Sequence, residues 1–129
     1  MKKFLSVLLI AMLLCGICVT ALAYDYAQVY WIKGAAGTYS SGGTYYSKTQ
    51  SGQKWHAYLD TSQEWPVKCY LWKKGDGVAS NTNTLAENRD YEINFYAGKA
   101  TVGAQYKMVM ISTKASSTER EYIVDYDLW

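Results

Sequence analysis

The stretch LCGIC contains two cysteines, Cys15 and Cys18, at the Cys-x-x-Cys spacing that redox and metal sites use. Both lie in an uncharged apolar run, residues 4–19, which follows a basic start and precedes the small-x-small pair Ala21 and Ala23. These features are typical of a secretory signal peptide that is cleaved after Ala23. We therefore predict that the cysteine pair is discarded with the signal. An uncleaved membrane anchor is the alternative, because about 20 uncharged residues can span a bilayer.

Cleavage would divide the chain into a signal peptide, residues 1–23, and one domain, residues 24–129. The whole chain has 13 Lys and Arg against 11 Asp and Glu, and Lys2 and Lys3 leave with the signal, so 11 of each sign remain. A chain without net charge has little long-range attraction for phosphate polyanions. We therefore expect no nucleic-acid partner. We also expect a monomer, with no membrane span once the apolar run has been removed.

The exported domain has one cysteine, Cys69, and one histidine, His56. Cys69 alternates with Val67 and Leu71 on a predicted strand, which indicates a buried thiol that behaves as a small hydrophobe. A reactive nucleophile or an intermolecular disulfide is the alternative for this odd cysteine. His56 falls on the expected outer face of its strand, with no second ligand at metal-binding spacing. This pattern predicts an exposed histidine, with a general base as the alternative.

Two groups of acidic residues could act as carboxylate pairs. Asp125 and Asp127 share one face of the last predicted strand, but the spacing of a calcium loop is absent, so we interpret them as solvated acids. Glu87, Asp90 and Glu92 could serve as a glycosidase pair only at a separation that a sequence does not reveal. The chain has no nucleophile elbow and no phosphate loop. The sequence therefore predicts no enzyme, no metal site and no cofactor.

The elements that must position these residues follow from period-two alternation and turn-rich breaks. No segment keeps an amphipathic helix pattern, and a chain with 13 Tyr and 5 Trp favours sheet. Breaks are expected in the Gly- and Ser-rich residues 34–43, in the polar residues 80–84, and at Gly52, Gly75 and Gly77, where we expect positive φ. The predicted strands are residues 24–32, 44–49, 54–60, 67–73, 91–96, 105–112 and 120–127. Such a pattern predicts an all-β fold, a single antiparallel β-sandwich of about seven strands, with a small barrel as the alternative.

Alternation also assigns the faces of the strands. Residues 106–111 are apolar on both faces, which predicts a central strand that is covered on both sides. Burial of each large inward side chain contributes roughly 1.5–3 kcal/mol, so a charge at Leu71 or Ile93 should abolish folding. The predicted inward residues are Trp55, Ala57, Leu59, Val67, Cys69, Leu71, Tyr91, Ile93, Phe95, Tyr122, Val124, Tyr126 and Leu128.

Aromatic side chains at outward positions are the main candidates for binding. Tyrosine and tryptophan join apolar area to a polar tip, so they can stack on sugar rings, accept peptides or sit at a membrane interface. If the strands that carry them are neighbours, they form one aromatic platform with a basic edge. The alternative is that they only form cross-strand pairs, each worth roughly 0.2–1 kcal/mol. The predicted binding residues are Tyr58, Tyr70, Trp72, Tyr96, Lys54 and Lys68.

Four stretches carry a family resemblance: YSSGGTYYSKTQSGQKWHAYLD, VKCYLWKKGDGVASNT, NFYAG and YIVDYDLW. In this order they resemble a family of short secreted proteins of Gram-positive bacteria whose function is unassigned. More distantly, the chain is similar to secreted bacteriocins of the lactococcin 972 type, which are small β-sandwiches that act on cell-wall synthesis. Trp55 and Trp72 match family tryptophans as structural strand residues, whereas the family's enriched histidines are absent, so contacts with a target are not carried over. The resemblance implies export by a Gram-positive cell and an all-β fold.

Together these observations predict a secreted, non-enzymatic β-sandwich that binds a cell-envelope component or a cell surface, with bacteriocin-like competition as one form of that activity. One alternative is an extracellular structural or adhesion module that self-associates through its strand edges. Another is a small hydrolase that uses His56 or the carboxylates.

Overall fold

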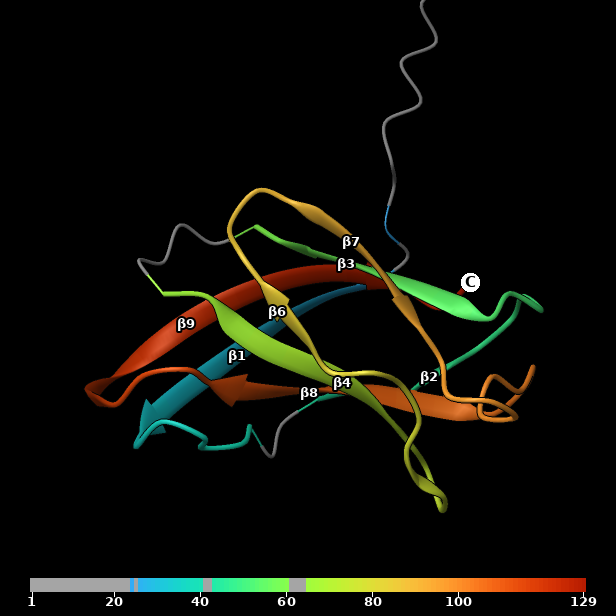
Figure 1. The fold of residues 1–129 in the computed structure, drawn as a ribbon, viewed down its shortest axis with the longest axis horizontal. Helices are drawn as coiled ribbons and strands as arrows, with labels where there is room; N and C mark the ends of the chain where they lie inside the picture. The colour runs from blue at the N-terminus through green and yellow to red at the C-terminus, as the bar shows by residue number, and fades with distance from the viewer. Residues whose placement is uncertain (1–23, 25, 41–42, 61–64) are drawn as a thin grey trace, which may run out of the picture.

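The computed structural model describes residues 24, 26–40, 43–60 and 65–129 of the chain. These residues form an all-β fold without a helix, in which nine strands make two antiparallel sheets (Figure 1). The predicted signal peptide, residues 1–23, lies outside the described residues together with its cysteine pair. No helix in the described part of the chain is long and apolar enough to cross a membrane.

The two sheets have four and five strands. The first has the order β1-β9-β3-β7, in which the strands are β1 (Tyr26–Gly34), β9 (Ser116–Asp127), β3 (Lys54–Leu59) and β7 (Asp90–Asn94). The second has the order β2-β8-β4-β5, with β6 also paired to β4, and its strands are β2 (Tyr46–Ser47), β8 (Gln105–Ser112), β4 (Val67–Lys73), β5 (Gly77–Val78) and β6 (Asn83–Leu85). Each of the seven predicted strands overlaps an observed one, and β4 and β8 agree to the residue.

Strands β5 and β6 lie where the sequence predicts breaks. Both are very short, and β6 is polar except for Leu85, which is fully buried and pairs with Val67 of β4. Alternation needs about four residues to be visible in a sequence, so segments of two or three residues show no period. Their strand conformation is set by pairing with β4, which is a tertiary interaction.

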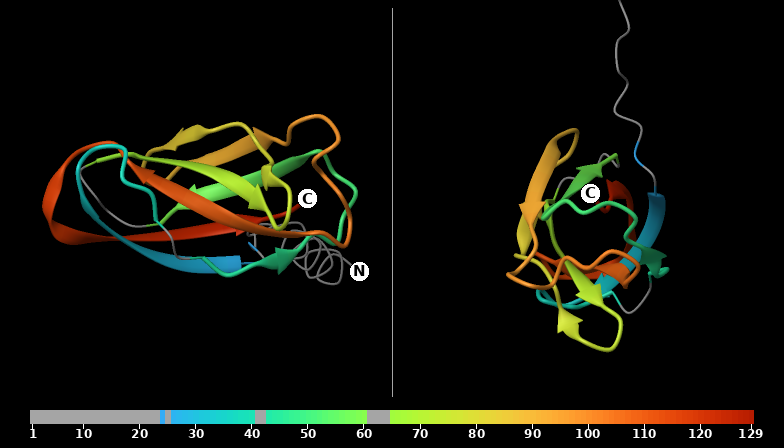
Figure 2. Two further views of the ribbon diagram at one scale, coloured as in Figure 1. Left: turned by 90° about the horizontal axis from the view of Figure 1, so that it is seen from below. Right: turned by 90° about the vertical axis from the view of Figure 1, so that its right-hand side faces the viewer.

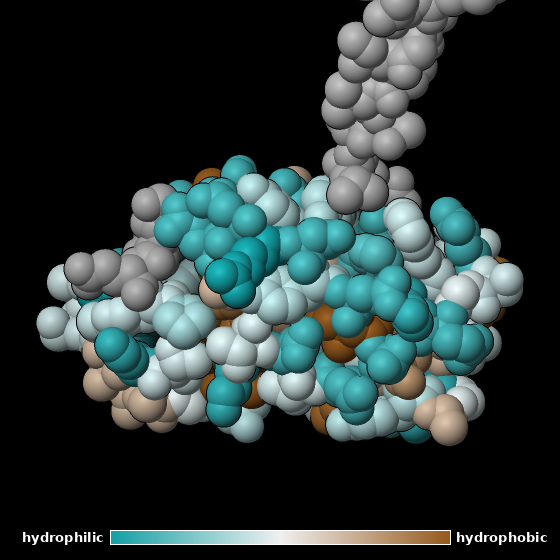
Figure 3. Space-filling view, turned by 45° about the horizontal axis from the view of Figure 1, so that its top comes forward, coloured by the Kyte–Doolittle hydropathy of each residue, from teal (hydrophilic) through white to brown (hydrophobic). Residues whose placement is uncertain are grey.

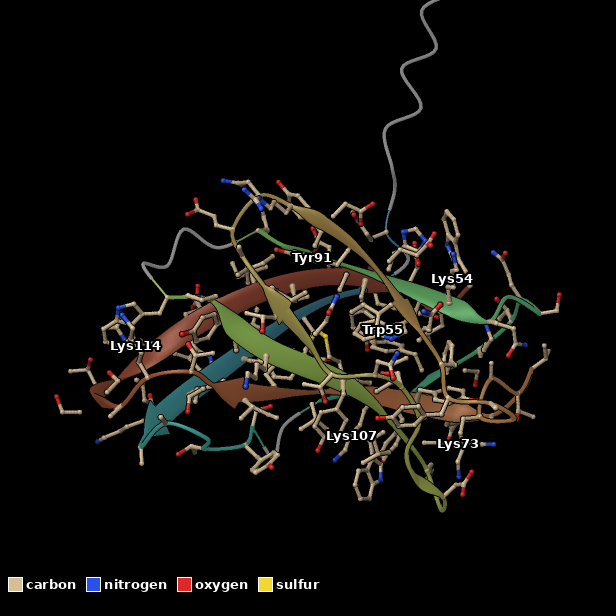
Figure 4. The ribbon with its side chains drawn as sticks, viewed as in Figure 1. Lys54, Trp55, Lys73, Tyr91, Lys107 and Lys114 are labelled. Atoms are coloured by element: carbon tan, nitrogen blue, oxygen red, sulfur yellow. The ribbon has the colours of Figure 1, made fainter. Side chains whose placement is uncertain are left out.

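The apolar faces of the two sheets share one core. The layers face each other in the end-on view of Figure 2, and Trp55 lies between them in Figure 4. Every predicted inward residue is buried except Tyr91, which is half-buried and packs against the same core. Cys69 is fully buried, as predicted, and burial raises the pKa of its thiol. The inward face assignment is therefore confirmed.

Strand β8 is central in its sheet, as its two apolar faces predict, because it pairs with β2 on one side and β4 on the other. Met108 and Met110 point into the core and are fully buried. On the opposite face Val109 is also buried and Ile111 is half-buried. The outer face of this strand is therefore covered over most of its length.

The glycine predictions have different outcomes. Gly75 and Gly77 have φ of 78° and 90°, as expected for the turn between β4 and β5. Gly52 has no positive φ, so that prediction is wrong. A Cβ atom at Gly52 would lie 2.5 Å from the carbonyl carbon of Trp129, so glycine is needed there because the chain end approaches closely.

Lys48 is a buried cation next to β2. Its Nζ donates to the carbonyl oxygen of Leu128 at 3.1 Å and lies 5.1 Å from the centre of the Phe95 ring. Burial lowers the pKa of this amine, and the nearby Asp127 carboxylate acts in the opposite direction. The hydrogen bond of Lys48 therefore connects Leu128, near the end of the chain, to the segment around β2.

Two buried tyrosines allow a matched test of core hydrogen bonding. Tyr30 in β1 donates to the carbonyl oxygen of Met108 in β8 at 3.0 Å, so this bond joins the two sheets. The Tyr126 hydroxyl is buried and has no hydrogen-bond partner among the described residues. We expect Tyr30→Phe to lower the free energy of unfolding by about 1–2 kcal/mol, and Tyr126→Phe to leave it unchanged or raise it by up to about 1 kcal/mol. Urea denaturation of both variants measures this, and equal losses would contradict it.

Candidate functional site

The residues predicted to form one aromatic platform lie on two different sheets. Lys54 and Tyr58 are in β3 of the four-stranded sheet, whereas Lys68, Tyr70 and Trp72 are in β4 of the five-stranded sheet. Strands β3 and β4 are not neighbours in either sheet. The structure therefore does not assemble a single platform, because the strand order separates its two halves.

The outward aromatics also differ in exposure. Trp72 and Tyr96 are exposed, as predicted. Tyr70 is buried, although it faces away from the core, and it lies opposite Val109 in the pairing of β4 with β8. Burial is the main cause that raises the pKa of Tyr70, and the nearby Tyr39 hydroxyl adds to it. Tyr70 therefore points outward, as predicted, but its ring is covered and does not form part of an exposed binding surface.

His56 is also less exposed than predicted, at 9%. It lies on the outer face of β3, but the Trp129 ring packs on it at 4.3 Å between ring centres. Its Nδ1 and Nε2 lie 3.6 Å from carboxylate oxygens of Asp90 and Glu92 on β7. The sequence could not show this burial, because Trp129 is more than 70 residues away along the chain.

The acidic residues lie around this histidine on the four-stranded sheet. Asp125 and Asp127 share a face of β9, as predicted, but Asp127 is 2% exposed and is therefore not a solvated acid. Burial raises the pKa of Asp125, with Asp60 as the smaller cause. Glu92 pairs with Lys54, whose hydrogen bond lowers the pKa of that carboxyl. Figure 3, turned so that the side of β3 and β7 comes forward, shows mostly hydrophilic residues.

The described residues include several potential metal ligands around His56. Within them, no three His, Cys, Asp or Glu side chains are grouped closely enough to hold a metal ion. The carboxylates beside His56 make ion-pair contacts with the imidazole and with Lys54. These contacts link the outer face of β3 to that of β7.

A groove of about 390 Å³ runs beside β1, and we call it the β1 groove. Three large apolar side chains on its lining are unusually exposed: Val29 at 50%, Trp31 at 57% and Tyr39 at 62%. Exposed apolar side chains grouped around a groove are typical of a binding surface. The groove is lined by Val29, Tyr30, Trp31, Ile32, Lys33, Thr38, Tyr39, Ser40 and Glu119.

Alternation in β1 places one wall of the groove. Tyr30 and Ile32 point into the core, so Val29, Trp31 and Lys33 point away from it. Among the described strands, β1 pairs with β9 alone and forms the edge of its sheet. The sequence predicts the strand but does not identify these residues as a site. A signal for this site was present in the sequence. Residues 29–32, VYWI, are apolar on both faces of the strand, although only one of these faces packs in the core.

The other wall of the groove comes from residues 38–40. The Ser40 amide N–H donates to the Met110 carbonyl oxygen at 2.8 Å, and the Ser112 amide N–H donates to the Thr38 carbonyl oxygen at 2.9 Å. This pairing with β8 places Tyr39 at the edge of the five-stranded sheet. Sequence reasoning missed Tyr39 because it lies in a Gly- and Ser-rich segment without any period.

The β1 groove offers the chemistry of a recognition site. Trp31 provides a large apolar ring. The hydroxyl groups of Thr38 and Ser40 lie on the lining, where the first donates to the Ala35 carbonyl oxygen at 2.7 Å and the second accepts from the Met110 amide N–H at 3.0 Å, so each keeps only its remaining hydrogen-bonding capacity for a ligand. Lys33 and Glu119 add one positive and one negative side chain. A ring that can stack, together with donors and acceptors beside it, suits a ligand with both apolar faces and hydroxyl groups.

Fold and site together define an all-β protein of two antiparallel sheets with an exposed aromatic groove at one edge. No protein-family model matches the chain, and no curated protein matches it either. The chain is similar to a solved structure described as the crystal structure of PirA, with 10% sequence identity and a TM-score of 0.47 over 83% of this chain and 98% of that one. A likeness this distant carries no argument about function.

Proposed function

We propose that this protein is a secreted, non-enzymatic β-sandwich that binds glycans of the cell envelope through the β1 groove. The observation that carries the proposal is the exposure of Trp31 at 57% on the lining of a groove of about 390 Å³. An exposed tryptophan ring offers a flat apolar surface for the apolar face of a sugar, and the groove supplies polar groups for its hydroxyls.

Binding rather than catalysis is supported by the surroundings of the titratable groups. His56 is stacked under Trp129 and lies between the Asp90 and Glu92 carboxylates, and none of these residues lines the β1 groove. Cys69 is fully buried in the core. Export is proposed from the signal-like residues that precede Ala23, and bacteriocin-like competition is one use to which envelope binding could be put.

Trp31→Ala tests the proposal. We expect this variant to lose roughly 10- to 100-fold in affinity for purified Gram-positive cell walls, because a central aromatic contact in an interface is worth about 1.4–2.8 kcal/mol. Trp72→Ala is the matched control, since Trp72 is also exposed but lies on β4, outside the groove. Pull-down with the cell walls at increasing protein concentration measures the affinity. If Trp72→Ala lost binding and Trp31→Ala did not, the site would lie on β4 and the proposal would be contradicted.

A second function is favoured by one observation, the position of β1 at the edge of its sheet. Strand β1 is the edge of the four-stranded sheet, and five consecutive residues, 29–33, line the groove beside it. Such an edge can accept a further strand, so two copies could pair there as a structural or adhesion module. Sedimentation over a range of concentrations tests this: assembly that Val29→Lys abolishes would support it, whereas a monomer at every concentration would contradict it.

A further inference from the structure

The outer face of the five-stranded sheet presents side chains that the β1 groove does not include. Lys68 and Trp72 point away from the core, because they alternate with the buried residues of β4. Trp72 lies directly opposite Lys107 of β8 on one side and Val78 of β5 on the other. Directly opposed residues of antiparallel strands share one face of the sheet. Trp72 and Val78, at 37% and 39% exposure, therefore form an exposed apolar spot beside Lys107.

The Tyr45 ring gathers two lysines next to this spot. Lys107 Nζ lies 5.3 Å and Lys74 Nζ lies 5.5 Å from the centre of the ring. Lys74 Nζ also donates to Gln105 Oε1 at 3.0 Å. A cation held over an aromatic ring keeps its charge and its remaining N–H donors. We call the surface that these side chains form the basic face, and it consists of Tyr45, Lys68, Trp72, Lys74, Val78 and Lys107.

The basic face carries positive charge that described carboxylates do not pair. The strands of the five-stranded sheet contain three lysines and no Asp or Glu. Asp76, in the turn between β4 and β5, pairs with Lys73 and Lys99. None of the three lysines of the basic face forms a salt bridge with a carboxylate in the described part of the chain. These three ammonium groups are therefore available to an anionic partner.

The four-stranded sheet has the opposite charge. Its strands contain three Lys and Arg against six Asp and Glu, a formal charge of −3 (three minus six), whereas those of the five-stranded sheet carry +3 (three minus zero). The two outer faces point in opposite directions, because the sheets share one core (Figure 2). Figure 4 shows Lys54 and Lys107 on opposite sides of the core residue Trp55. A domain whose predicted exported form is neutral overall is thus polarised between its two sides.

We propose that the basic face docks the protein on a membrane surface rich in anionic phospholipids. Trp72 and Val78 lie at the boundary between headgroups and acyl chains, where tryptophan is favoured. The three lysines contact lipid phosphates, since a lysine can lay its apolar stem along the boundary and keep its charge in the headgroup layer. The acidic four-stranded sheet is repelled by the same surface, so the charge polarity fixes which side faces the lipid.

This membrane surface is separate from the site of the proposed function. None of the residues of the basic face lines the β1 groove. The protein can therefore hold a glycan in the groove and a bilayer on the basic face independently, and the inference goes beyond glycan binding.

A bilayer fits the basic face better than a nucleic acid does. Single strands are bound by a series of exposed rings along a positive groove, whereas Trp72 is exposed and Tyr45 is half-buried. Val78 offers no flat surface to a base, but it gains from the apolar edge of a headgroup layer. The exposed aliphatic side chain beside the tryptophan therefore favours lipid.

Vesicle binding tests the inference. The exported form, residues 24–129, contains both sheets and is mixed with vesicles of phosphatidylcholine alone or with an equal share of phosphatidylglycerol, at low and high salt. We expect at least roughly tenfold tighter binding to the anionic vesicles at low salt, because each lysine at an anionic surface contributes roughly fivefold. High salt should remove most of this preference. Co-sedimentation at increasing lipid concentration measures the affinity, and single-stranded poly(dT) is titrated in parallel.

Two double variants locate the charge effect. Lys68→Ala with Lys107→Ala should weaken binding to the anionic vesicles by roughly tenfold or more. Lys33→Ala with Lys54→Ala removes the same charge from the four-stranded sheet, and should change the affinity by less than about twofold because that sheet faces away from the lipid. Thermal unfolding of each variant checks that the fold is intact.

Two single variants separate the inference from the proposed function. Trp72→Ala should weaken vesicle binding roughly tenfold, because the exposed part of its ring leaves water on docking. Trp31→Ala should leave vesicle binding unchanged. For cell walls free of lipid the order is reversed, since Trp31 lines the groove and Trp72 does not.

Several results would overturn the inference. One is vesicle binding that Trp31→Ala removes and Trp72→Ala does not, because the bilayer would then lie on the β1 groove. Equal affinity for the two kinds of vesicle, or equal losses in the two double variants, would refute the role of the basic face. Tighter binding to poly(dT) than to anionic vesicles would assign the face to nucleic acid instead. Each of these results leaves the cell-wall test of Trp31→Ala to decide on glycan binding by itself.

Discussion

Leu71→Asp is expected to abolish folding. Leu71 is fully buried at the centre of β4, between the two sheets. The substitution removes a contribution of roughly 2–5 kcal/mol from packing and places a carboxylate in the apolar core, which costs several kcal/mol more. Together, the two losses are larger than the stability of a domain at the lower end of the usual range of about 5–15 kcal/mol. Circular dichroism and the dispersion of amide proton signals in NMR spectra measure the loss of structure.

Lys68→Asp is the matched control for this prediction. It introduces the same residue into the same strand, three positions away, but on the exposed face. We expect it to change the free energy of unfolding by no more than about 0.5 kcal/mol. A folded Leu71→Asp protein would mean that the inner face of β4 has been assigned to the wrong side.

Raising the pH from 10 to about 12 is expected to unfold the protein cooperatively. Burial raises the pKa of the Tyr30 and Tyr126 hydroxyls far above their ordinary value of 10.0, with smaller contributions from neighbouring residues. The folded chain therefore keeps protons that the unfolded chain releases. Their stabilisation is complete below the unfolded pKa and is lost as the pH rises toward the folded pKa.

The free energy of unfolding is expected to fall steeply with pH. Each buried tyrosine that stays protonated lowers the free energy of unfolding by about 1.4 kcal/mol for every pH unit above its unfolded pKa. The two tyrosines together lower it by about 3 kcal/mol per pH unit. A domain with a stability of about 6 kcal/mol would then unfold near pH 12. Lys48, whose pKa is lowered, acts in the opposite direction, because its uncharged form is favoured in the folded state.

Urea denaturation at several alkaline pH values measures this slope, and phenolate absorbance reports the ionisation. The double variant Tyr30→Phe with Tyr126→Phe should show a shallower slope than the natural protein, whatever its stability at neutral pH. If both proteins lost stability equally with pH, the two hydroxyls would not be the buried groups responsible.

Local alternation predicted the strands and their inward faces. Trp55, Leu71 and Tyr126 are buried as expected, and Cys69 is the buried thiol that its neighbours indicate. Successive side chains of a strand point to opposite faces, so a run of six or seven residues contains the information needed. The two sheets of antiparallel strands follow from the same pattern and from the turn residues between the strands.

The candidate site could be predicted only in part. The aromatic residues chosen from outward positions were divided between the sheets, and the β1 groove contains none of them. Trp31 could have been found from the apolar outer face of its strand. Tyr39 could not, because its place at the sheet edge depends on pairing with Ile111, more than 70 residues away.

The sequence by itself determined which residues of each strand face the core, because that information is contained in a period of two along the chain. The tertiary structure decided which strands are neighbours, and with this the burial of His56 under Trp129, the burial of Lys48 against Leu128, and the meeting of β1 with residues 38–40. Those outcomes depend on contacts between residues that are distant in sequence. A local pattern contains no information about such contacts, since the same alternation is compatible with many strand orders.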